Sequence, residues 1–235
     1  QHYCAPNRAF TTEKKLVLSE AVHPFYYKKV YKEENYEVIK YPETPYPWIF
    51  GGYFPESENE TSEARAVEAG INWLKEVPEE DPFFLRISFN GPHTPVVPPS
   101  PFADLIESEE INIPQDSEKL RQDPPAWIEE TLASFAKASR LSRDEIKKMR
   151  SYYYGEVSFL DHQWGRLIDY LEENQLLSNT IIVYVSDHGT HLGDYNLVQK
   201  QTFYEPVVKV PFFFFFPKMV EPGYRVKTSV ETRAM

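Results

Sequence analysis

The chain has 235 residues, of which 41% are hydrophobic and 15% aromatic, so it can build a substantial core and is not a disordered segment. Its net charge of −11 argues against nucleic acid as the main partner, because contacts to a phosphate backbone need clustered lysine and arginine. The most apolar stretch, residues 212–216, lies between two prolines and is far shorter than the roughly 20 residues that cross a bilayer. No membrane span is therefore expected.

The N-terminal third contains an irregular part followed by a helix. Residues 1–60 are rich in Tyr, Lys, Glu and Pro, which predicts irregular excursions with short strands at most. A helix is predicted next, with Thr61 or Ser62 as its N-cap and an end near Val77. Its apolar residues recur at helical spacing: Val67, Ile71 and Leu74.

A short apolar run, residues 83–89, lies between Pro82 and the turn sequence at 90–92. This pattern predicts a largely buried strand that ends at the turn. Residues 94–140 are acidic and rich in proline, which predicts a long surface excursion.

Ser142 and Glu145 have the spacing of a capping box and predict the start of a long helix that ends near Asn174. Its predicted apolar stripe consists of Tyr153, Val157, Leu160, Trp164, Leu167 and Leu171. Apolar runs at 180–185 and 210–216 predict two more buried strands. Strand, long helix and strand form the crossover unit of an α/β sheet, so the sequence predicts an α/β fold, without internal repeats or a separable second domain.

Residues able to do chemistry follow two of the predicted strands. Asp187-His188-Gly189 comes directly after the run at 180–185, and residues 90–95 follow the run at 83–89. In α/β sheets, ligands lie at the carboxyl ends of strands. A carboxylate beside an imidazole could hold a divalent cation, although the same triplet could also be a helix cap or a stabilised turn.

The spacing of motifs around this triplet is more specific than the triplet itself. The motifs are Ser-Asp-His-Gly at 186–189, Leu-Gly at 192–193, Lys200, Tyr-Glu at 204–205 and Val-Pro at 210–211. This series resembles the sulfatase family of the alkaline-phosphatase superfamily. The Pro-His-Thr-Pro sequence at 92–95 resembles the family's P-H-x-P segment, and residues 159–167 resemble its long helix. The resemblance covers residues 61–217, whereas residues 1–60 match poorly.

The resemblance implies a mixed, mainly parallel sheet sandwiched by helices, and it implies a role for four residues. Asp187 and His188 match the metal ligands of the family, which hold Ca²⁺ (Mg²⁺ or another divalent cation being possible) together with two N-terminal aspartates. Lys200 and His93 match residues that contact the sulfate. A cation and a lysine stabilise the anion, and a histidine can hydrogen-bond the sulfate or protonate the leaving group.

Each of these residues also has a plainer interpretation. Lys200 alone would be a solvated surface residue, and His93 alone a histidine that packs in a turn. No role follows for three further residues near the motifs: His191, Asp194 and Tyr195, the last at a place where many relatives have histidine. Asp161 is expected to be a helix-packing or capping carboxylate.

Cys4, the only cysteine, excludes an intrachain disulfide and raises the question of the nucleophile. Sulfatases convert a cysteine in a C-x-P-S-R stretch to formylglycine, whose hydrated aldehyde attacks the ester. Residues 4–8 read Cys-Ala-Pro-Asn-Arg, which fits C-x-P-x-R. Asn7 replaces the usual serine, however, the usual continuation is missing, and the separation from the run at 83–89 is short. Cys4 is therefore either the formylglycine precursor or an incidental cysteine.

The paired N-terminal aspartates and the K-x-H segment of the family are also missing. We therefore expect residues 1–235 to be one incomplete portion of a sulfatase catalytic domain, with weak metal affinity and no isolated activity. The complete protein is expected to be exported and to hydrolyse an aryl or carbohydrate sulfate ester. The alternatives are a phosphodiesterase or phosphonate monoester hydrolase of the same superfamily, and a non-catalytic sulfatase-like binding module.

Overall fold

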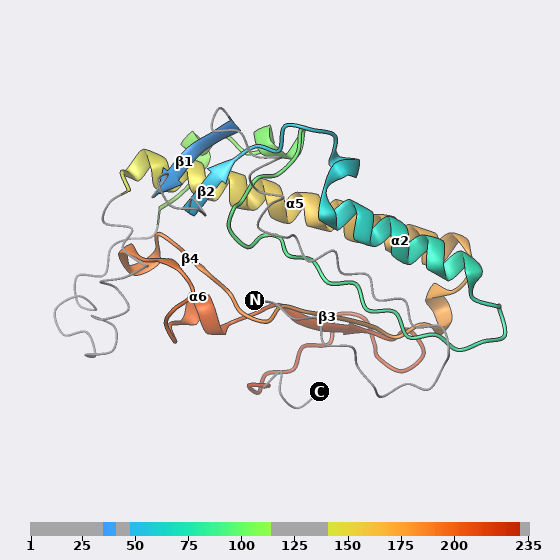
Figure 1. Cartoon of the computed structure of the whole chain (residues 1–235). Helices are drawn as coiled ribbons and strands as arrows, with labels where there is room; N and C mark the ends of the chain where they lie inside the picture. Colours follow the sequence, from blue (N-terminus) through green and yellow to red (C-terminus); the bar gives the residue numbers. More distant parts are fainter. Residues whose placement is uncertain (1–34, 41–47, 114–140, 231–235) are drawn as a thin grey trace. The chain divides into compact units, whose positions relative to one another are not determined.

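The computed structural model describes residues 35–40, 48–113 and 141–230 (Figure 1). The chain divides into two compact units. The first comprises Gln1–Ile111 and Lys147–Tyr170, and the second Asn112–Ile146 and Leu171–Met235. Each unit is described by itself below. Within the described ranges, no helix has the length and apolar character needed to cross a bilayer.

The first unit begins with a β-hairpin. Strands β1 (Tyr36–Lys40) and β2 (Trp48–Gly52) pair in antiparallel fashion, with a register shift near Val38. The hairpin lies beside α5 (Figure 1), where Lys148 Nζ is 3.1 Å from Glu37 Oε2. These strands agree with the prediction of short strands at most before residue 60.

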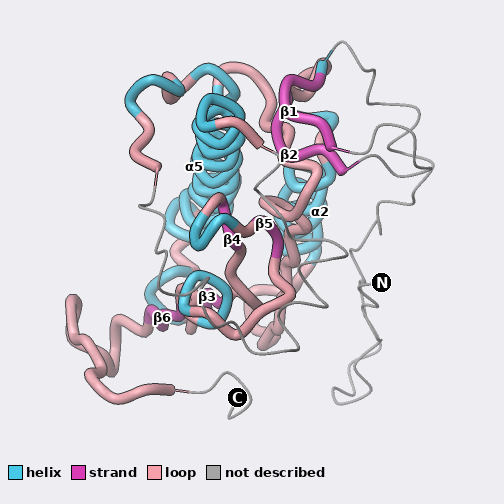
Figure 2. The backbone as a smooth tube through the Cα atoms, turned by 90° about the vertical axis from the view of Figure 1, so that its left-hand side faces the viewer, coloured by secondary structure: helices cyan, strands magenta, loops and turns pink. Residues whose placement is uncertain are grey.

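Helix α2 (Ser62–Glu76) confirms the predicted helix and its cap. The Thr61 hydroxyl accepts a hydrogen bond from the Ala64 N–H at 3.1 Å, which satisfies one of the unpaired donors of the first turn. The predicted apolar residues Val67, Ile71 and Leu74 are buried. Helix α2 and helix α5 (Arg143–Glu173) lie side by side in both views (Figures 1 and 2).

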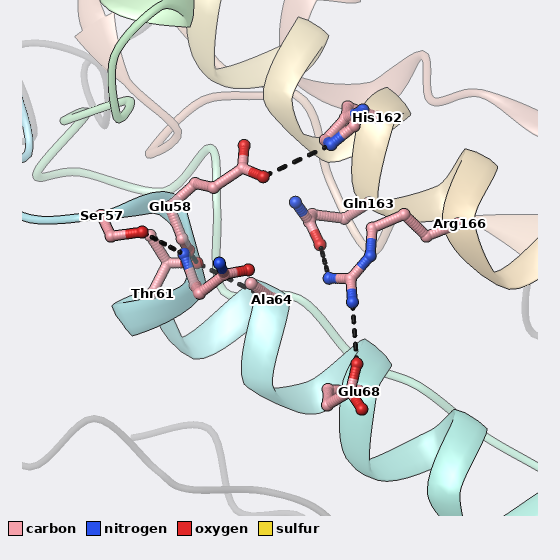
Figure 3. A network of polar contacts seen from close by, with 9 residues as sticks. Ser57, Glu58, Thr61, Ala64, Glu68, His162, Gln163 and Arg166 are labelled. Atoms are coloured by element: carbon pink, nitrogen blue, oxygen red, sulfur yellow. Dashed lines mark hydrogen bonds and ion pairs between the residues drawn. The ribbon is translucent and has the colours of Figure 1, made fainter.

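Polar contacts join the two helices along their exposed edge (Figure 3). Arg166 donates to Glu68 at 2.8 Å and also to Gln163 at 2.8 Å. Nearer the start of α2, His162 Nε2 lies 3.6 Å from a carboxylate oxygen of Glu58. The described residues also include five short 3₁₀ segments: Glu58–Glu60, Phe102–Asp104, Ser108–Glu110, Leu177–Asn179 and Asp194–Asn196.

Residues 83–89 are extended, but no ladder of the described residues includes them. The predicted strand is therefore wrong as a paired strand, and its burial is one-sided, because Phe84 is 67% exposed. The apolar side chains of this segment face a helix. A Cβ at Gly70 of α2 would lie 2.9 Å from the Ile87 side chain, so the inward apolar residues pack on α2.

The segment that follows the turn at 90–93 is less exposed than predicted. Val96, Val97, Pro98, Pro99 and Ala103 are buried. The Val96 carbonyl accepts from the Gly52 N–H at 3.1 Å, and the Pro98 carbonyl from the Phe54 N–H at 2.9 Å. Because the chain runs along β2, its small apolar residues become core. The remainder of the predicted excursion, residues 114–140, lies outside the described residues.

The capping box that starts α5 is confirmed. Glu145 accepts from the Ser142 N–H at 2.6 Å, and the Ser142 hydroxyl accepts from the Glu145 N–H at 3.2 Å. The predicted stripe is correct at Leu160, Leu167 and Leu171, but Val157 is 44% exposed. Met149, Tyr152, Phe159 and Gln163 complete the buried face instead.

The described part of the second unit contains two small antiparallel sheets and the short helix α6. Strands β3 (Ile182–Val185) and β6 (Phe212–Phe215) form one sheet, and β4 (His191–Leu192) and β5 (Val198–Gln199) form the other. Helix α6 covers Glu205–Val208. In the first sheet, the Tyr184 and Phe213 rings stack with centroids 4.8 Å apart.

Strands and helices in both units give the chain the predicted α/β fold. The expectation of fully buried strands is wrong for β3 and β6. Ile182 is buried, whereas Val183, Val185 and Phe213–Phe215 are exposed. All ladders between the named strands of the described chain are antiparallel, so the predicted crossover between parallel strands is not among them.

A buried carboxyl group lies in the middle of α5. Glu156 is 7% exposed, and its Oε2 has no hydrogen-bond partner among the described residues. Burial raises the pKa of Glu156 well above its ordinary value, and the nearby Glu63 raises it further. The folded protein therefore holds a proton on Glu156 that the unfolded chain releases above its lower, ordinary pKa.

We predict that Glu156→Gln stabilises the complete protein at neutral pH. Because the pKa of Glu156 is raised in the folded state, the wild type loses stability as pH rises from the ordinary pKa of glutamate to the folded pKa. The neutral amide of glutamine does not titrate, so the variant has no such loss. Thermal unfolding at several pH values should show a higher midpoint for the variant at neutral pH and convergence in acid. An equal or lower midpoint for the variant at neutral pH would contradict a neutral Glu156.

Candidate functional site

The turn at Ser186–Gly189 follows β3 directly and is held by backbone contacts. Its Ser186 N–H donates to the Pro211 carbonyl at 3.3 Å, and its Gly189 N–H donates to the Val207 carbonyl at 2.7 Å. A Cβ at Gly189 would lie 2.0 Å from the Pro206 carbonyl oxygen, so only glycine allows this approach. The turn is therefore fixed against the segment that runs from α6 to β6.

Asp187 presents its carboxylate to solvent from this turn. One carboxylate oxygen, Oδ1, accepts from the His188 N–H at 2.9 Å, and the side chain is 67% exposed. The hydrogen bond orients the group, while the exposure leaves its oxygens accessible. Carboxylate oxygens are the ligands that Ca²⁺ and Mg²⁺ prefer.

The His188 ring is held from both sides. Its Nδ1 lies 2.7 Å from the Gly189 carbonyl oxygen, which can only accept a hydrogen bond, so Nδ1 carries the hydrogen. The lone pair is then on Nε2, which lies 2.7 Å from Lys200 Nζ and accepts from the ammonium. The same Nε2 is 3.7 Å from the Asp187 carboxylate.

Lys200 comes directly after β5 and reaches back to the turn. Partial burial lowers the pKa of Lys200, and the negative charge of Asp187 opposes that effect. A cation that is partly removed from water and only partly compensated attracts an anion. Asp187, His188 and Lys200 thus form one cluster within the second unit, which we call the lysine–imidazole cluster.

The β4–β5 hairpin that carries Lys200 is built around a buried histidine. His191 is 1% exposed, and its Nε2 lies 2.7 Å from the Thr202 hydroxyl. The rings of Tyr195 and Tyr204 each lie 6.0 Å from the imidazole, edge to face. Burial lowers the pKa of His191 to about 4, against the opposing charge of Asp194. The imidazole is therefore neutral at physiological pH.

His191 and Thr202 hold the two ends of the segment that bears Lys200. The Thr202 N–H donates to the Lys200 carbonyl at 2.8 Å, and the Thr202 hydroxyl accepts from the Tyr204 N–H at 3.3 Å. No role for His191 could be predicted, because strands of two residues are too short to show alternating polarity in the sequence. Its link to Thr202, eleven residues later, has no sequence signal of its own.

His93 belongs to the first unit, whereas the other three predicted site residues belong to the second. Its N–H donates to the Asn90 carbonyl at 3.0 Å and closes the turn at 90–93. The ring Nδ1 lies 2.7 Å from the Thr94 carbonyl oxygen, which again assigns the hydrogen to Nδ1 and the lone pair to Nε2.

Other residues considered from the sequence have structural surroundings. Asp194 accepts from the Leu192 N–H at 3.1 Å and stabilises the hairpin, and Tyr195 packs with Tyr204 at 4.9 Å between ring centroids. Asp161 is exposed in the middle of α5, so the prediction of a helix-packing or capping role is wrong. Cys4 lies outside the described residues.

The residues present supply part of a metal site. Among the residues that the structure describes, no group of three or more His, Cys, Asp or Glu side chains could hold a metal ion. The Asp187 carboxylate suits a hard cation. The Nε2 lone pair of His188 could bind one only if Lys200 moved away, because that lone pair accepts from the ammonium.

A family model described as Sulfatase matches residues 11–233. The chain belongs to the sulfatase family. It is 32% identical to an arylsulfatase of Clostridium perfringens over 163 residues, and the match covers 68% of this chain and 33% of that protein. A sulfatase of Formosa agariphila is 33% identical over 186 residues, covering 77% of this chain and 36% of that protein. The chain thus spans about a third of the length of these curated relatives.

The fold of this sulfatase-family chain also resembles solved structures. The phosphonate monoester hydrolase of Agrobacterium radiobacter superposes with a TM-score of 0.65 at 23% identity, over 71% of this chain and 35% of that one. This similarity supports the α/β fold and carries no information on the reaction.

We predict that His191 makes the stability of the complete protein depend on pH in a definite window. The pKa of His191 is about 4 in the folded state. At pH values between about 4 and the ordinary pKa of histidine, His191 therefore carries a proton in the unfolded chain but not in the folded protein. Stability should therefore fall, by about 1 to 3 kcal/mol, as pH falls through this window.

The free energy of unfolding of the wild type and of His191→Gln is measured at pH 7, 6, 5 and 4. The difference between the two proteins at each pH isolates His191, because the other titrating groups contribute equally to both. Thr202→Val is the matched control, since it removes the hydrogen bond and keeps the imidazole. If the wild type and His191→Gln lose stability in parallel, the depressed pKa is refuted.

Proposed function

We propose that the complete protein hydrolyses sulfate esters with a divalent metal ion and a formylglycine nucleophile. The observation that carries the proposal is the lysine–imidazole cluster: Lys200 Nζ lies 2.7 Å from His188 Nε2, next to an exposed Asp187 carboxylate. Membership of the sulfatase family supports the same reaction. Because the chain spans about a third of its relatives, the activity is proposed for the complete protein.

Lys200 is proposed to bind a non-bridging oxygen of the sulfate group. The lysine reaches the strand tip from the neighbouring hairpin, and its ammonium is partly withdrawn from water. Such a preorganised cation stabilises negative charge more strongly than it would in bulk water. Lys200 would therefore contribute to both substrate binding and stabilisation of the transition state.

Asp187 and His188 are proposed as two of the metal ligands, with Ca²⁺ the first candidate and Mg²⁺ or another divalent cation the alternative. The bound ion would supply Lewis-acid stabilisation of the sulfate and of the attacking oxygen. Further ligands would have to come from residues outside this cluster. Since His188 has one lone pair, Lys200 would exchange its hydrogen bond to His188 for one to the sulfate when the site is complete.

His93 is proposed to face the same sulfate group, where its Nε2 would hydrogen-bond the ester or protonate the leaving oxygen. Cys4 stays a hypothesis as the formylglycine precursor, with an incidental cysteine as the alternative. For the fold, we propose that residues 1–235 form one portion of a catalytic domain whose complete sheet is mixed and mainly parallel. The proposed substrates are aryl or carbohydrate sulfates.

The proposal predicts that the complete protein hydrolyses nitrophenyl sulfate and that Lys200→Ala lowers kcat/KM by about a hundredfold or more. The matched control is Lys209→Ala, since Lys209 is an exposed lysine of the same unit that pairs with Glu205. Removal of divalent metal by a chelator should abolish the reaction, and Ca²⁺ should restore it.

Three outcomes would contradict the proposal. Lys200→Ala could match the control, hydrolysis could persist after removal of the metal, or bis(nitrophenyl) phosphate or nitrophenyl phenylphosphonate could be preferred over the sulfate. The last result would favour a phosphodiesterase or a phosphonate monoester hydrolase, because a lysine and a metal ion can bind a tetrahedral anion of either kind. A protein that binds sulfate without hydrolysing any of these esters would be a sulfatase-like binding module.

A further inference from the structure

Two buried glutamates of the first unit meet at the turn that precedes His93. Glu63 lies in the first turn of α2 and is 7% exposed. One of its carboxylate oxygens accepts from the Ser62 hydroxyl at 2.9 Å, and the other accepts from the Gly91 N–H at 3.0 Å. The latter bond joins residues 28 positions apart and ties the turn to the helix.

Glu156 approaches the same glycine from α5. A Cβ at Gly91 would lie 2.6 Å from Glu156 Oε1, so the carboxyl group leaves no room for a side chain there. The other oxygen, Oε2, is buried, and no residue in the described part of the chain hydrogen-bonds to it. The backbone of Gly91 is therefore in contact with carboxyl groups from two helices.

This arrangement is costly for a purely structural contact. Burying a carboxyl group with an unpaired oxygen costs free energy, and an apolar side chain of similar size would pack α5 without that cost. Placing a second carboxyl group nearby adds repulsion, which raises the pKa of Glu156 further. Both glutamates contact the turn at 90–93. This turn is closed by a hydrogen bond from the His93 N–H to the Asn90 carbonyl, which fixes the backbone of His93.

We propose that Glu63 and Glu156 are positioning residues, which set His93 by holding the backbone of Gly91 between helices α2 and α5. Glu63 fixes the turn through the Gly91 N–H, and Glu156 limits how close the turn can come to α5. The inference rests on the proposed function, in which His93 contacts the sulfate. A small displacement of such a group costs up to about a hundredfold in rate.

A double-mutant cycle in the complete protein tests the inference, with nitrophenyl sulfate as the substrate. Glu63→Ala should lower kcat by about tenfold to a hundredfold with little change in KM, and Glu63→Gln, which keeps an acceptor oxygen for Gly91, should recover most of the loss. In a His93→Ala background, Glu63→Ala should have no further effect, because Glu63 acts through His93.

Two more variants complete the design. Glu68→Ala is the matched control, because Glu68 lies on the same helix but pairs with Arg166; it should leave kcat unchanged. In Gly91→Ala the added methyl group would meet Glu156 Oε1 at 2.6 Å. Because Glu156 is buried and has little room to shift, the turn should move instead and reproduce the Glu63→Ala phenotype, including its absence in the His93→Ala background. This variant provides the same test if Glu63→Ala fails to fold, which thermal unfolding of each variant will show.

The outcomes separate this inference from the proposed function. If Glu63→Ala lowers kcat by the same factor with and without His93, or not at all, the two glutamates are structural and the inference is overturned alone. If His93→Ala itself leaves kcat/KM unchanged, the role of His93 in the proposed function is overturned, and the positioning role falls with it.

Discussion

The chemistry of the candidate site depends on one lone pair, that of His188 Nε2. The Gly189 carbonyl keeps the hydrogen on Nδ1, so Nε2 is the acceptor for the Lys200 ammonium at 2.7 Å. This lone pair can serve the lysine or a metal ion, but not both at once. Under the proposed function, metal binding at His188 and release of Lys200 toward the sulfate are therefore one event, which couples the cation to the group that recognises the anion.

Backbone contacts, more than side-chain packing, hold the residues in place. The Gly189 N–H donates to the Val207 carbonyl of α6 at 2.7 Å, and this hydrogen bond keeps the turn next to that helix. His191 and Thr202 fix the hairpin that carries Lys200. In the first unit, a side chain does the same for Gly91, whose N–H donates to the Glu63 carboxylate at 3.0 Å. Functional side chains on tight, pinned turns need little ordering when a ligand arrives.

Local patterns in the sequence predicted the local structure well. The caps of α2 and α5 follow from Thr61 and from the pairing of Ser142 with Glu145, since capping depends only on neighbours along the chain. The partner of an apolar run is set by the tertiary fold. Residues 83–89 therefore pack on α2 rather than in a ladder, and β3 pairs with β6 in antiparallel fashion. The spacing of motifs singled out Asp187, His188 and Lys200, and the structure brings these three side chains together. The contact of Glu63 with Gly91 has no signature in the sequence.

The state of the His188 ring tests the account most directly. Nuclear magnetic resonance of the complete, metal-free protein with ¹⁵N-labelled histidine, assigned by comparison with His188→Gln, reports which ring nitrogen carries hydrogen. We predict hydrogen on Nδ1 and not on Nε2, and an Nε2 resonance that shifts in Lys200→Ala. Hydrogen on Nε2, or an Nε2 resonance that does not shift in Lys200→Ala, would show that His188 and Lys200 are not hydrogen-bond partners.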